Sequence, residues 1–194
     1  MDLSKFKTSD WLKVGGGALM LVAGFLTWWQ PTCPSGVNSS ACEATIDALD
    51  LDINAFDLTF TGLFPWLLLV AIGVLTFLAV AGIFKLPDSM PWPTIFLAAA
   101  GFSALMVVIR LLADPFDTGL VDDATERGIG MYLAVVAAAL VLFGCIKGYT
   151  ESGGNLSDLK DMNKMKSQFG GGSSGGGTPP PPPPPGMPPP PPPR

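Results

Sequence analysis

The chain has 194 residues, of which 48% are hydrophobic and only 14% are charged, and its formal net charge is −5. Because soluble domains carry roughly 25% charged residues, this composition argues against a soluble domain and favours a membrane protein. Histidine is absent, which removes the commonest general base and the commonest metal ligand at neutral pH.

Four stretches contain about 20 mainly apolar residues each, the length that a helix needs to cross a bilayer. In lipid every backbone amide needs an internal partner, so we expect these stretches to be helices. The first begins like a signal peptide, with lysines before an apolar run, but its end, "TWWQPTC", lacks a small-x-small cleavage site, which favours a retained helix. The sequence therefore predicts an all-α membrane protein with a four-transmembrane-helix bundle over residues 11–149. The predicted spans are residues 11–29, 61–84, 93–113 and 128–149.

The charges of the connecting segments predict the orientation. The N-terminal segment 1–10, the link between the second and third spans and the C-terminal segment all contain lysine. The loops 30–60 and 114–127 are acidic, and Arg127 is their one basic residue. Since basic loops stay in the cytoplasm, both termini are predicted to be cytoplasmic, and the two acidic loops to lie outside the plasma membrane. Aromatic residues expected at the outer interface are Trp28, Trp29, Trp66 and Tyr132, and those expected at the inner interface are Trp11, Trp92 and Tyr149.

The first outer loop contains two cysteines, Cys33 and Cys42. An extracellular loop permits disulfides, and closing so short a ring would stabilise it by about 2.7 kcal/mol in the chain-entropy model. We therefore expect a disulfide that staples this loop. Further along, Leu49–Phe60 alternates apolar and polar residues, which predicts a short strand. Its carboxylates begin like a calcium loop but do not continue as one, so weak cation binding and a solvated acidic rim both stay open.

Ionisable side chains are absent from the middle of all four predicted spans. Transporters, channels and intramembrane enzymes usually carry such groups there. Arg110 lies near the outer end of the third span, where we expect it to act as an interfacial anchor that meets Asp114 four residues on; a substrate-binding charge is the alternative. Cys145 is expected to be a small apolar core residue.

No motif for catalysis, phosphate binding or nucleic-acid binding is present in the sequence. We therefore predict no catalytic residue, cofactor site or metal site, and no nucleic-acid partner. Small residues are frequent in three spans, as in the run Gly15–Gly17, and permit close helix packing. Whether this packing lies within one chain or in a homo-oligomer is left open.

The C-terminal part has two sections. Residues 150–169 begin with a helix break, "ESGG", and continue with the spacing of an amphipathic helix on the inner leaflet or on a partner; a solvated helix is the alternative. Residues 170–194 form a Gly/Ser linker and a disordered proline-rich tail, with proline runs Pro179–Pro185 and Pro188–Pro193 that end in Arg194. Polyproline II segments dock in aromatic-lined grooves, so we expect a cytoplasmic polyproline-binding partner, with a merely solubilising tail as the alternative.

The Ala/Gly/Val-rich spans, the stretch "INAFDLTFTGLFPWLLLVAIGVLTFL" and the tail resemble small four-span membrane proteins of actinobacteria with Gly/Pro-rich cytoplasmic tails. Trp29 followed by Cys33 and Cys42 in the first outer loop is similar in layout to claudin-type tetraspans, without their Gly-Leu-Trp triplet. Neither resemblance carries catalytic residues. Together these features predict a non-enzymatic membrane scaffold or adaptor of the cell envelope, embedded in the lipid bilayer. The alternative is a small transporter or channel subunit.

Overall fold

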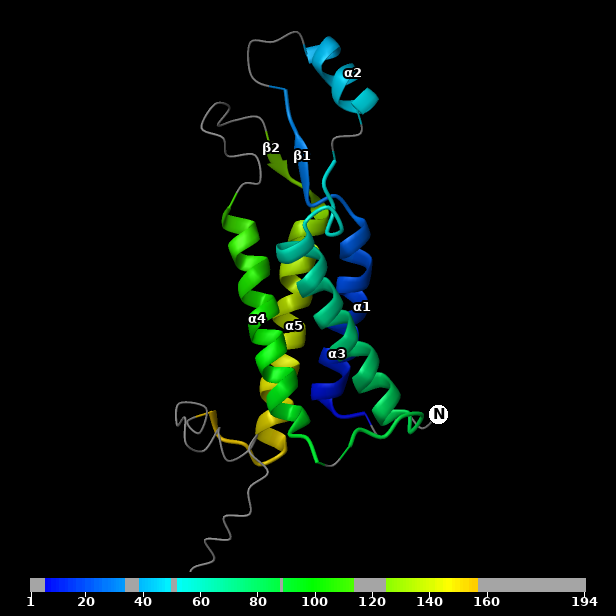
Figure 1. Ribbon diagram of the computed structural model, residues 1–194, viewed down its shortest axis with the longest axis vertical. Coiled ribbons are helices and arrows are strands. Elements are labelled where there is room, and N and C mark those ends of the chain that lie inside the picture. Colours follow the sequence, from blue (N-terminus) through cyan, green and yellow to red (C-terminus); the bar gives the residue numbers. More distant parts are fainter. Residues whose placement is uncertain (1–5, 34–38, 50–51, 88, 114–124, 157–194) are drawn as a thin grey trace, which may run out of the picture.

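Four long helices lie side by side in the computed structural model, which describes residues 6–33, 39–49, 52–87, 89–113 and 125–156 (Figure 1). Each helix contacts two neighbours, so that the order around the bundle is α1, α3, α4, α5 and back to α1. The short helix α2 and the two-stranded sheet lie beyond one end of the bundle. The bounds are α1 Thr8–Phe25, β1 Trp29–Pro31, α2 Ser39–Leu49, the π-helical turn Thr59–Leu63, α3 Phe64–Val80, α4 Trp92–Leu112, β2 Thr125–Arg127 and α5 Ile129–Glu151.

Three helical segments are long and apolar enough to cross a membrane: Thr59–Val80, Trp92–Leu112 and Ile129–Glu151. They correspond to the second, third and fourth predicted spans, and their length and composition are typical of a helical membrane protein. The first predicted span, residues 11–29, overlaps α1, which is less apolar because Asp10 and Lys13 lie in its first turns. This helix also ends at Phe25, four residues before the predicted boundary at Trp29.

Proline and glycine set several of the helix ends. Pro65 and Pro93 lie in the first turns of α3 and α4, where a missing N–H costs nothing. Beyond the C-terminal ends of α3 and α5, Gly82 and Gly153 have φ angles of +73° and +88°, a conformation that glycine adopts without strain. The "ESGG" helix break therefore lies where the sequence predicts it. Most of the predicted amphipathic helix, and all of the proline tail, lie outside the described residues.

Trp28 and Trp29 are buried in the protein, whereas the sequence analysis placed them at the lipid interface. Their exposed fractions are 0% and 1%. The Trp28 indole donates to the Ala23 carbonyl oxygen (2.8 Å), and Trp29 begins β1, which pairs with the antiparallel strand β2. Trp29 also forms an isolated bridge with Ile53. The chain therefore leaves the helix after Phe25 because these two indoles pack inward.

The predicted strand Leu49–Phe60 does not form in the part of this range that the structure describes, Leu49 and residues 52–60. Leu49 is the last residue of α2, and Ile53 makes the single bridge to Trp29. A local turn then interrupts the extended backbone, because the Asn54 backbone N–H donates to Asp57 Oδ2 (2.9 Å) and the Phe56 N–H donates to Asn54 Oδ1 (2.8 Å). Asn and Asp favour such turns over strand ladders, so the polar residues Asn54 and Asp57 stabilise a turn in place of a strand.

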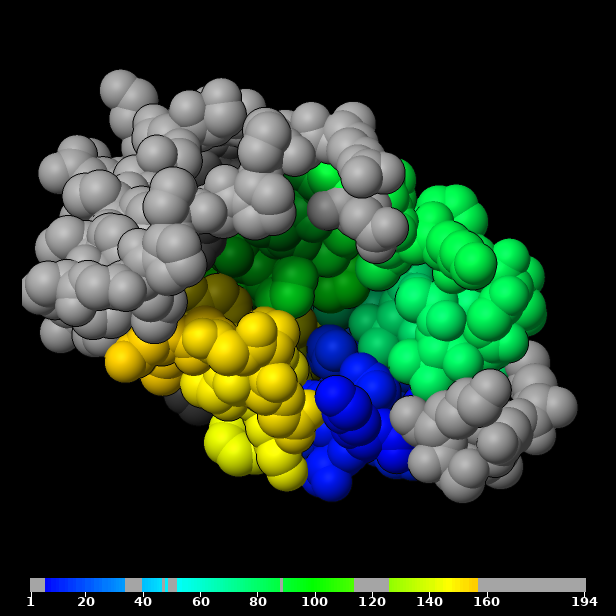
Figure 2. Space-filling model, turned by 90° about the horizontal axis from the view of Figure 1, so that it is seen from below, coloured from blue at the N-terminus to red at the C-terminus, as the bar shows by residue number. Residues whose placement is uncertain are grey.

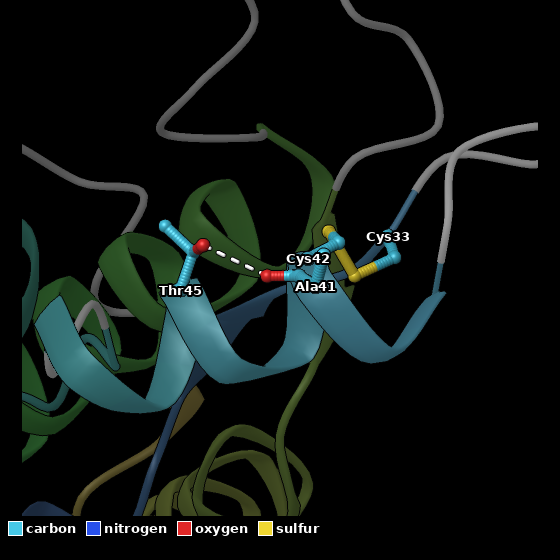
Figure 3. The surroundings of a disulfide bond; sticks show 4 residues. All are labelled: Cys33, Ala41, Cys42 and Thr45. Carbon is cyan, nitrogen blue, oxygen red and sulfur yellow. Dashed lines mark hydrogen bonds between the residues drawn. A yellow bond between two sulfur atoms is a disulfide. The ribbon is translucent and has the colours of Figure 1, made fainter.

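The predicted disulfide between Cys33 and Cys42 is confirmed (Figure 3). It joins the segment after β1 to the first turns of α2, with Cα atoms 6.0 Å apart. One turn further along α2, the Thr45 hydroxyl donates to the Ala41 carbonyl oxygen (2.8 Å). The bond therefore fixes α2 close to the sheet at this end of the molecule.

Two adjacent glycines let α1 approach both of its neighbours closely. A Cβ atom on Gly17 would lie 2.8 Å from Gly73 Cα in α3, and one on Gly16 would lie 3.0 Å from the Ala137 carbonyl oxygen in α5. Gly15, in contrast, faces open space. Small residues at such contacts bring backbones together and increase van der Waals packing, the main source of helix association in lipid. The glycine run of the first predicted span thus packs α1 against helices of the same chain.

Adding one methyl group at these positions tests the packing. We expect Gly17→Ala to destabilise the bundle by about 1–3 kcal/mol, because the new Cβ requires α1 and α3 to separate. Gly15→Ala is the matched control, with the same chemical change and no neighbour to meet, and it should be neutral or slightly stabilising. Equilibrium unfolding of the purified protein in detergent would measure both, and equal effects would contradict the close-packed arrangement.

Candidate functional site

The two ends of the bundle differ, and we name them by what they hold. The loop end carries α2, β1 and β2, and the terminal end holds the start of α1, the link between α3 and α4, and the end of α5 (Figure 1). A cavity of about 190 Å³ opens at the terminal end, where atoms of α1, α5 and the α3–α4 link surround a recess (Figure 2). Its lining combines an ion pair, two hydroxyl groups and an aromatic wall, drawn from all four long helices.

The ion pair joins Asp10 and Lys13 on α1. Lys13 Nζ lies 2.9 Å from Asp10 Oδ1, and the two side chains are only 12% and 14% exposed. Asp10 Oδ2 also accepts the backbone N–H of Lys7 (3.2 Å), so the carboxylate caps the first turn of the helix as well. Both charges are thereby paired on one wall of the cavity.

Glycines on α5 make room for the lysine. A Cβ atom on Gly144 would lie 3.0 Å from the Lys13 backbone nitrogen and 3.0 Å from its Cγ, and one on Gly148 would lie 3.4 Å from Lys13 Nζ. The Gly-x-x-x-Gly spacing therefore accommodates Lys13 of the same chain. Nearby, the buried Ser9 hydroxyl donates to Glu151 Oε2 (2.7 Å), which ties the first turn of α1 to the last turn of α5.

Two hydroxyl-bearing residues of the lining, Thr76 on α3 and Tyr149 on α5, are 4% and 3% exposed. Their hydroxyl oxygens have no hydrogen-bond partner among the residues that the structure describes. A buried polar group without a partner costs about 1–3 kcal/mol, so native proteins rarely keep one. Both oxygens are enclosed by protein, so neither hydroxyl is open to a ligand in the cavity.

The third wall is aromatic and comes from the start of α4. Trp92 and Phe96 line the cavity, with ring centroids 5.7 Å apart. The Trp92 indole donates to the Pro87 carbonyl oxygen (3.0 Å), which fixes its position against the α3–α4 link. Pro93 adds a further apolar surface. The cavity is thus bounded by an ion pair on one wall and by an apolar, aromatic surface on another.

Within the described ranges, no group of three or more His, Cys, Asp or Glu side chains is arranged to hold a metal ion. At the loop end, Glu43 and Asp52 line a larger and more polar recess beside the disulfide. Of the calcium-like run, the Asp52 carboxylate contacts the local fold: the Thr27 hydroxyl donates to Asp52 Oδ2 (3.2 Å). Cation binding at the acidic loops stays a prediction.

Arg110 lies in the last turn of α4, half-buried, with its guanidinium carbon 6.0 Å from the centre of the Trp29 ring. Arg127 lies over the same ring at 5.2 Å, and its Nε donates to the Leu111 carbonyl oxygen (3.0 Å). These two arginines join the end of α4 to the sheet. Asp114, the predicted partner of Arg110, lies outside the described residues, as do Pro179, Pro185, Pro188, Pro193 and Arg194, so the anchor and docking roles stay predictions.

The sequence analysis missed the cavity at the terminal end. Tyr149 and Trp92 were expected to be interfacial aromatics and Cys145 an apolar core residue; the structure places these three, together with Lys13, in the cavity lining. Cys145 is buried, as expected. One signal was available: Asp10 and Lys13 are three residues apart in a helix, which puts a carboxylate and an ammonium on one face.

Comparison with known proteins returned no match: no family model fits the chain, and no curated protein or solved structure matches it. The resemblances to actinobacterial four-span proteins and to claudin-type tetraspans therefore stay predictions.

Removing one charge of the cavity wall tests its electrostatics. We expect Asp10→Asn to destabilise the protein by about 1–3 kcal/mol, because it leaves the largely buried Lys13 ammonium without its partner. The double variant Asp10→Asn/Lys13→Met should recover most of this loss, since no unpaired charge remains. Lys85→Met, at an exposed position of the same end, is the control. Equilibrium unfolding in detergent measures the unaltered protein, these three variants and Lys13→Met alone; additive effects of the two wall substitutions would show that the charges are not coupled.

Proposed function

We propose that the chain is a four-span protein of the plasma membrane, with both termini in the cytoplasm, and that it acts as a scaffold or adaptor. The observation that carries this proposal is the distribution of polar groups. The bundle interior is packed with small and apolar side chains, whereas the ion pairs and hydrogen-bonded side chains concentrate at its two ends. Such a bundle is suited to hold its terminal segments at a fixed place on the membrane.

The packing of α1 supports its role as the fourth span. This helix contacts α5 and α3 most extensively, and its 18 residues correspond to about 27 Å, close to the thickness of the hydrocarbon core. Leu21, Val22 and Phe25 point away from the bundle and are 43%, 53% and 66% exposed. These large apolar side chains suit contact with lipid, like those on the outer faces of α3, α4 and α5. The charged residues of α1 lie at the terminal end.

The orientation follows from charge. Lys7, Lys13, Lys85 and Lys147 lie toward the terminal end, together with Asp10 and Glu151. The loop end carries Glu43, Asp52, Asp57 and Glu126, together with Arg110 and Arg127. The positive-inside rule then assigns the terminal end to the cytoplasm. A disulfide in α2 is in keeping with an extracellular loop end. The proline-rich tail, which follows α5, would extend into the cytoplasm as a docking element for an aromatic-lined polyproline-binding protein.

The rival proposal, a small transporter or channel subunit, has less support. Among the described residues, the side chains that are both polar and fully buried are Ser9, Thr76, Thr94 and Ser103, and none of them is charged. Transport pathways usually present ionisable groups at mid-span. The sequence contains no catalytic motif, so we nominate no catalytic residue and propose a non-enzymatic role.

Replacing the tail tests the adaptor role. Affinity purification from native membranes would compare the full chain, a chain that ends at Thr178, and a chain in which the prolines of 179–193 are replaced by Gly and Ser. We expect both altered chains to insert normally and to lose a cytoplasmic partner, because only polyproline II presents the pre-extended rod that such partners bind. Recovery of the same partners in the same amounts with the Gly/Ser tail would contradict the docking role.

A further inference from the structure

An apolar groove runs along the outer face of the bundle, where α1 and α3 lie side by side (Figure 1). Its volume is about 230 Å³. Every residue that lines it is apolar, from the small Gly17, Ala18 and Gly73 to the larger Val14, Leu21 and Phe77. A Cβ atom on Gly17 would lie 2.8 Å from Gly73 Cα, so the two backbones meet at the groove and leave space between the larger side chains on either side.

The groove faces lipid in the four-span arrangement proposed above, on which this inference rests. Two of its residues, Leu21 and Val74, are 43% and 48% exposed, so it opens away from the bundle interior. Between Val14 and Leu21 the helix rises roughly 10 Å, which is shorter than the roughly 15 Å of hydrocarbon in one leaflet. Because every lining residue is apolar, the matching occupant is a hydrocarbon chain that enters from one leaflet.

Aromatic rings lie where the groove reaches the terminal end. The Phe77 ring, which lines the groove, has its centre 6.2 Å from that of Phe6, and Phe6 lies 5.1 Å from Trp11. Trp11 is 50% exposed, as is typical of an indole at the level of the lipid headgroups. The groove therefore ends at the depth where a phospholipid changes from hydrocarbon to headgroup.

Lys7 supplies a positive charge at this level. Its side chain is exposed, and it precedes Val14 by seven residues, which places the two positions on the same side of α1. Asp10 Oδ2 accepts the Lys7 N–H (3.2 Å), but the Asp10 carboxylate is paired with Lys13, so these three residues together carry one net positive charge. From Lys7 to Leu21 the helix rises roughly 21 Å, close to the depth of one leaflet with its headgroups, roughly 20–22 Å.

We propose that the groove between α1 and α3 holds one acyl chain of an anionic phospholipid whose phosphate lies at Lys7. A second copy of the chain fits less well, because a two-fold contact through the groove would bring the two Lys7 ammonium groups to the same end of the interface, where they repel each other. The lipid has the opposite charge and the matching length. Since it binds the folded bundle, it stabilises the contact of α1, the least apolar of the four long helices, with α3.

A photoreactive lipid would locate the chain. The full protein would be placed in phosphatidylcholine nanodiscs with a trace of phosphatidylglycerol that carries a diazirine on one acyl chain, and peptide mass spectrometry would locate the adducts after illumination. We expect more adducts at Ala18 and Val74 in the groove than at Leu105, which is 55% exposed on α4. One lysine favours an anionic lipid about fivefold, so replacing half of the phosphatidylcholine with unlabelled phosphatidylglycerol should lower the groove adducts about threefold. Adducts at Leu105 should not change.

Two pairs of variants separate the headgroup from the chain. Lys7→Gln should abolish the effect of added phosphatidylglycerol, whereas Lys147→Gln, which removes the same charge at the same end from a helix that does not line the groove, should preserve it. Ala18→Phe fills the groove and should reduce adducts at Val74 to the level of Leu105. Ala139→Phe, at an exposed position of α5, is its matched control. Lys7 is exposed, so the Lys7→Gln result does not depend on whether Ala18→Phe folds normally.

Several outcomes would overturn the proposal. Equal adducts in the groove and at Leu105, or no response to phosphatidylglycerol, would show that ordinary bilayer lipid covers the groove without selection. An undiminished response in Lys7→Gln would remove the headgroup from Lys7. A dimeric protein without groove adducts would show that a second copy covers this face. None of these readouts involves the proline tail, so the adaptor role would stand, whereas the sided position of α1 is measured separately by thiol labelling.

Discussion

The close approach of α1 to α3 and α5 is the constraint on which the rest of the molecule depends. Gly16 and Gly17 present backbone, not side chain, to Ala137 and Gly73. Because lipid provides no hydrophobic drive for helix association, such contacts must supply much of the packing energy. They position the whole helix, and with it both ends of the bundle. The ion pair at its start faces the cavity, and the two tryptophans that follow its end pack against α5 and the sheet.

The two ends are held in different ways. At the loop end, Trp29 lies beneath the guanidinium groups of Arg110 and Arg127, and backbone pairing and a disulfide add further links. The terminal end keeps an open cavity with two unpartnered hydroxyls. The loop end is therefore closed by several links, whereas the terminal end keeps an open surface.

How far the sequence predicts the structure depends on the kind of signal. Long apolar runs identify α3, α4 and α5 to within a few residues, although α3 ends four residues before the predicted span does. Two cysteines in one loop identify the disulfide. Hydropathy does not distinguish an indole that faces lipid from one buried in protein, and so Trp28 was misplaced. The alternation of apolar and polar residues predicted a strand through Asn54, but the Asn54 side chain accepts a backbone N–H in a turn. The cavity was missed because it depends on how four helices are rotated about their axes, which single-sequence spacing does not specify.

The central claim, that α1 crosses the membrane as the fourth span, is tested most directly by sided labelling of the residues that flank it. Cysteines would be placed singly at Lys7, before α1, and at Ala48, exposed on α2, and treated with a membrane-impermeant thiol reagent in intact cells of the native host. The buried Cys145 of the unaltered chain gives the background. The account predicts that position 48 reacts in intact cells and that position 7 reacts only after lysis. Reaction of both positions from the same side would show that α1 does not cross the membrane.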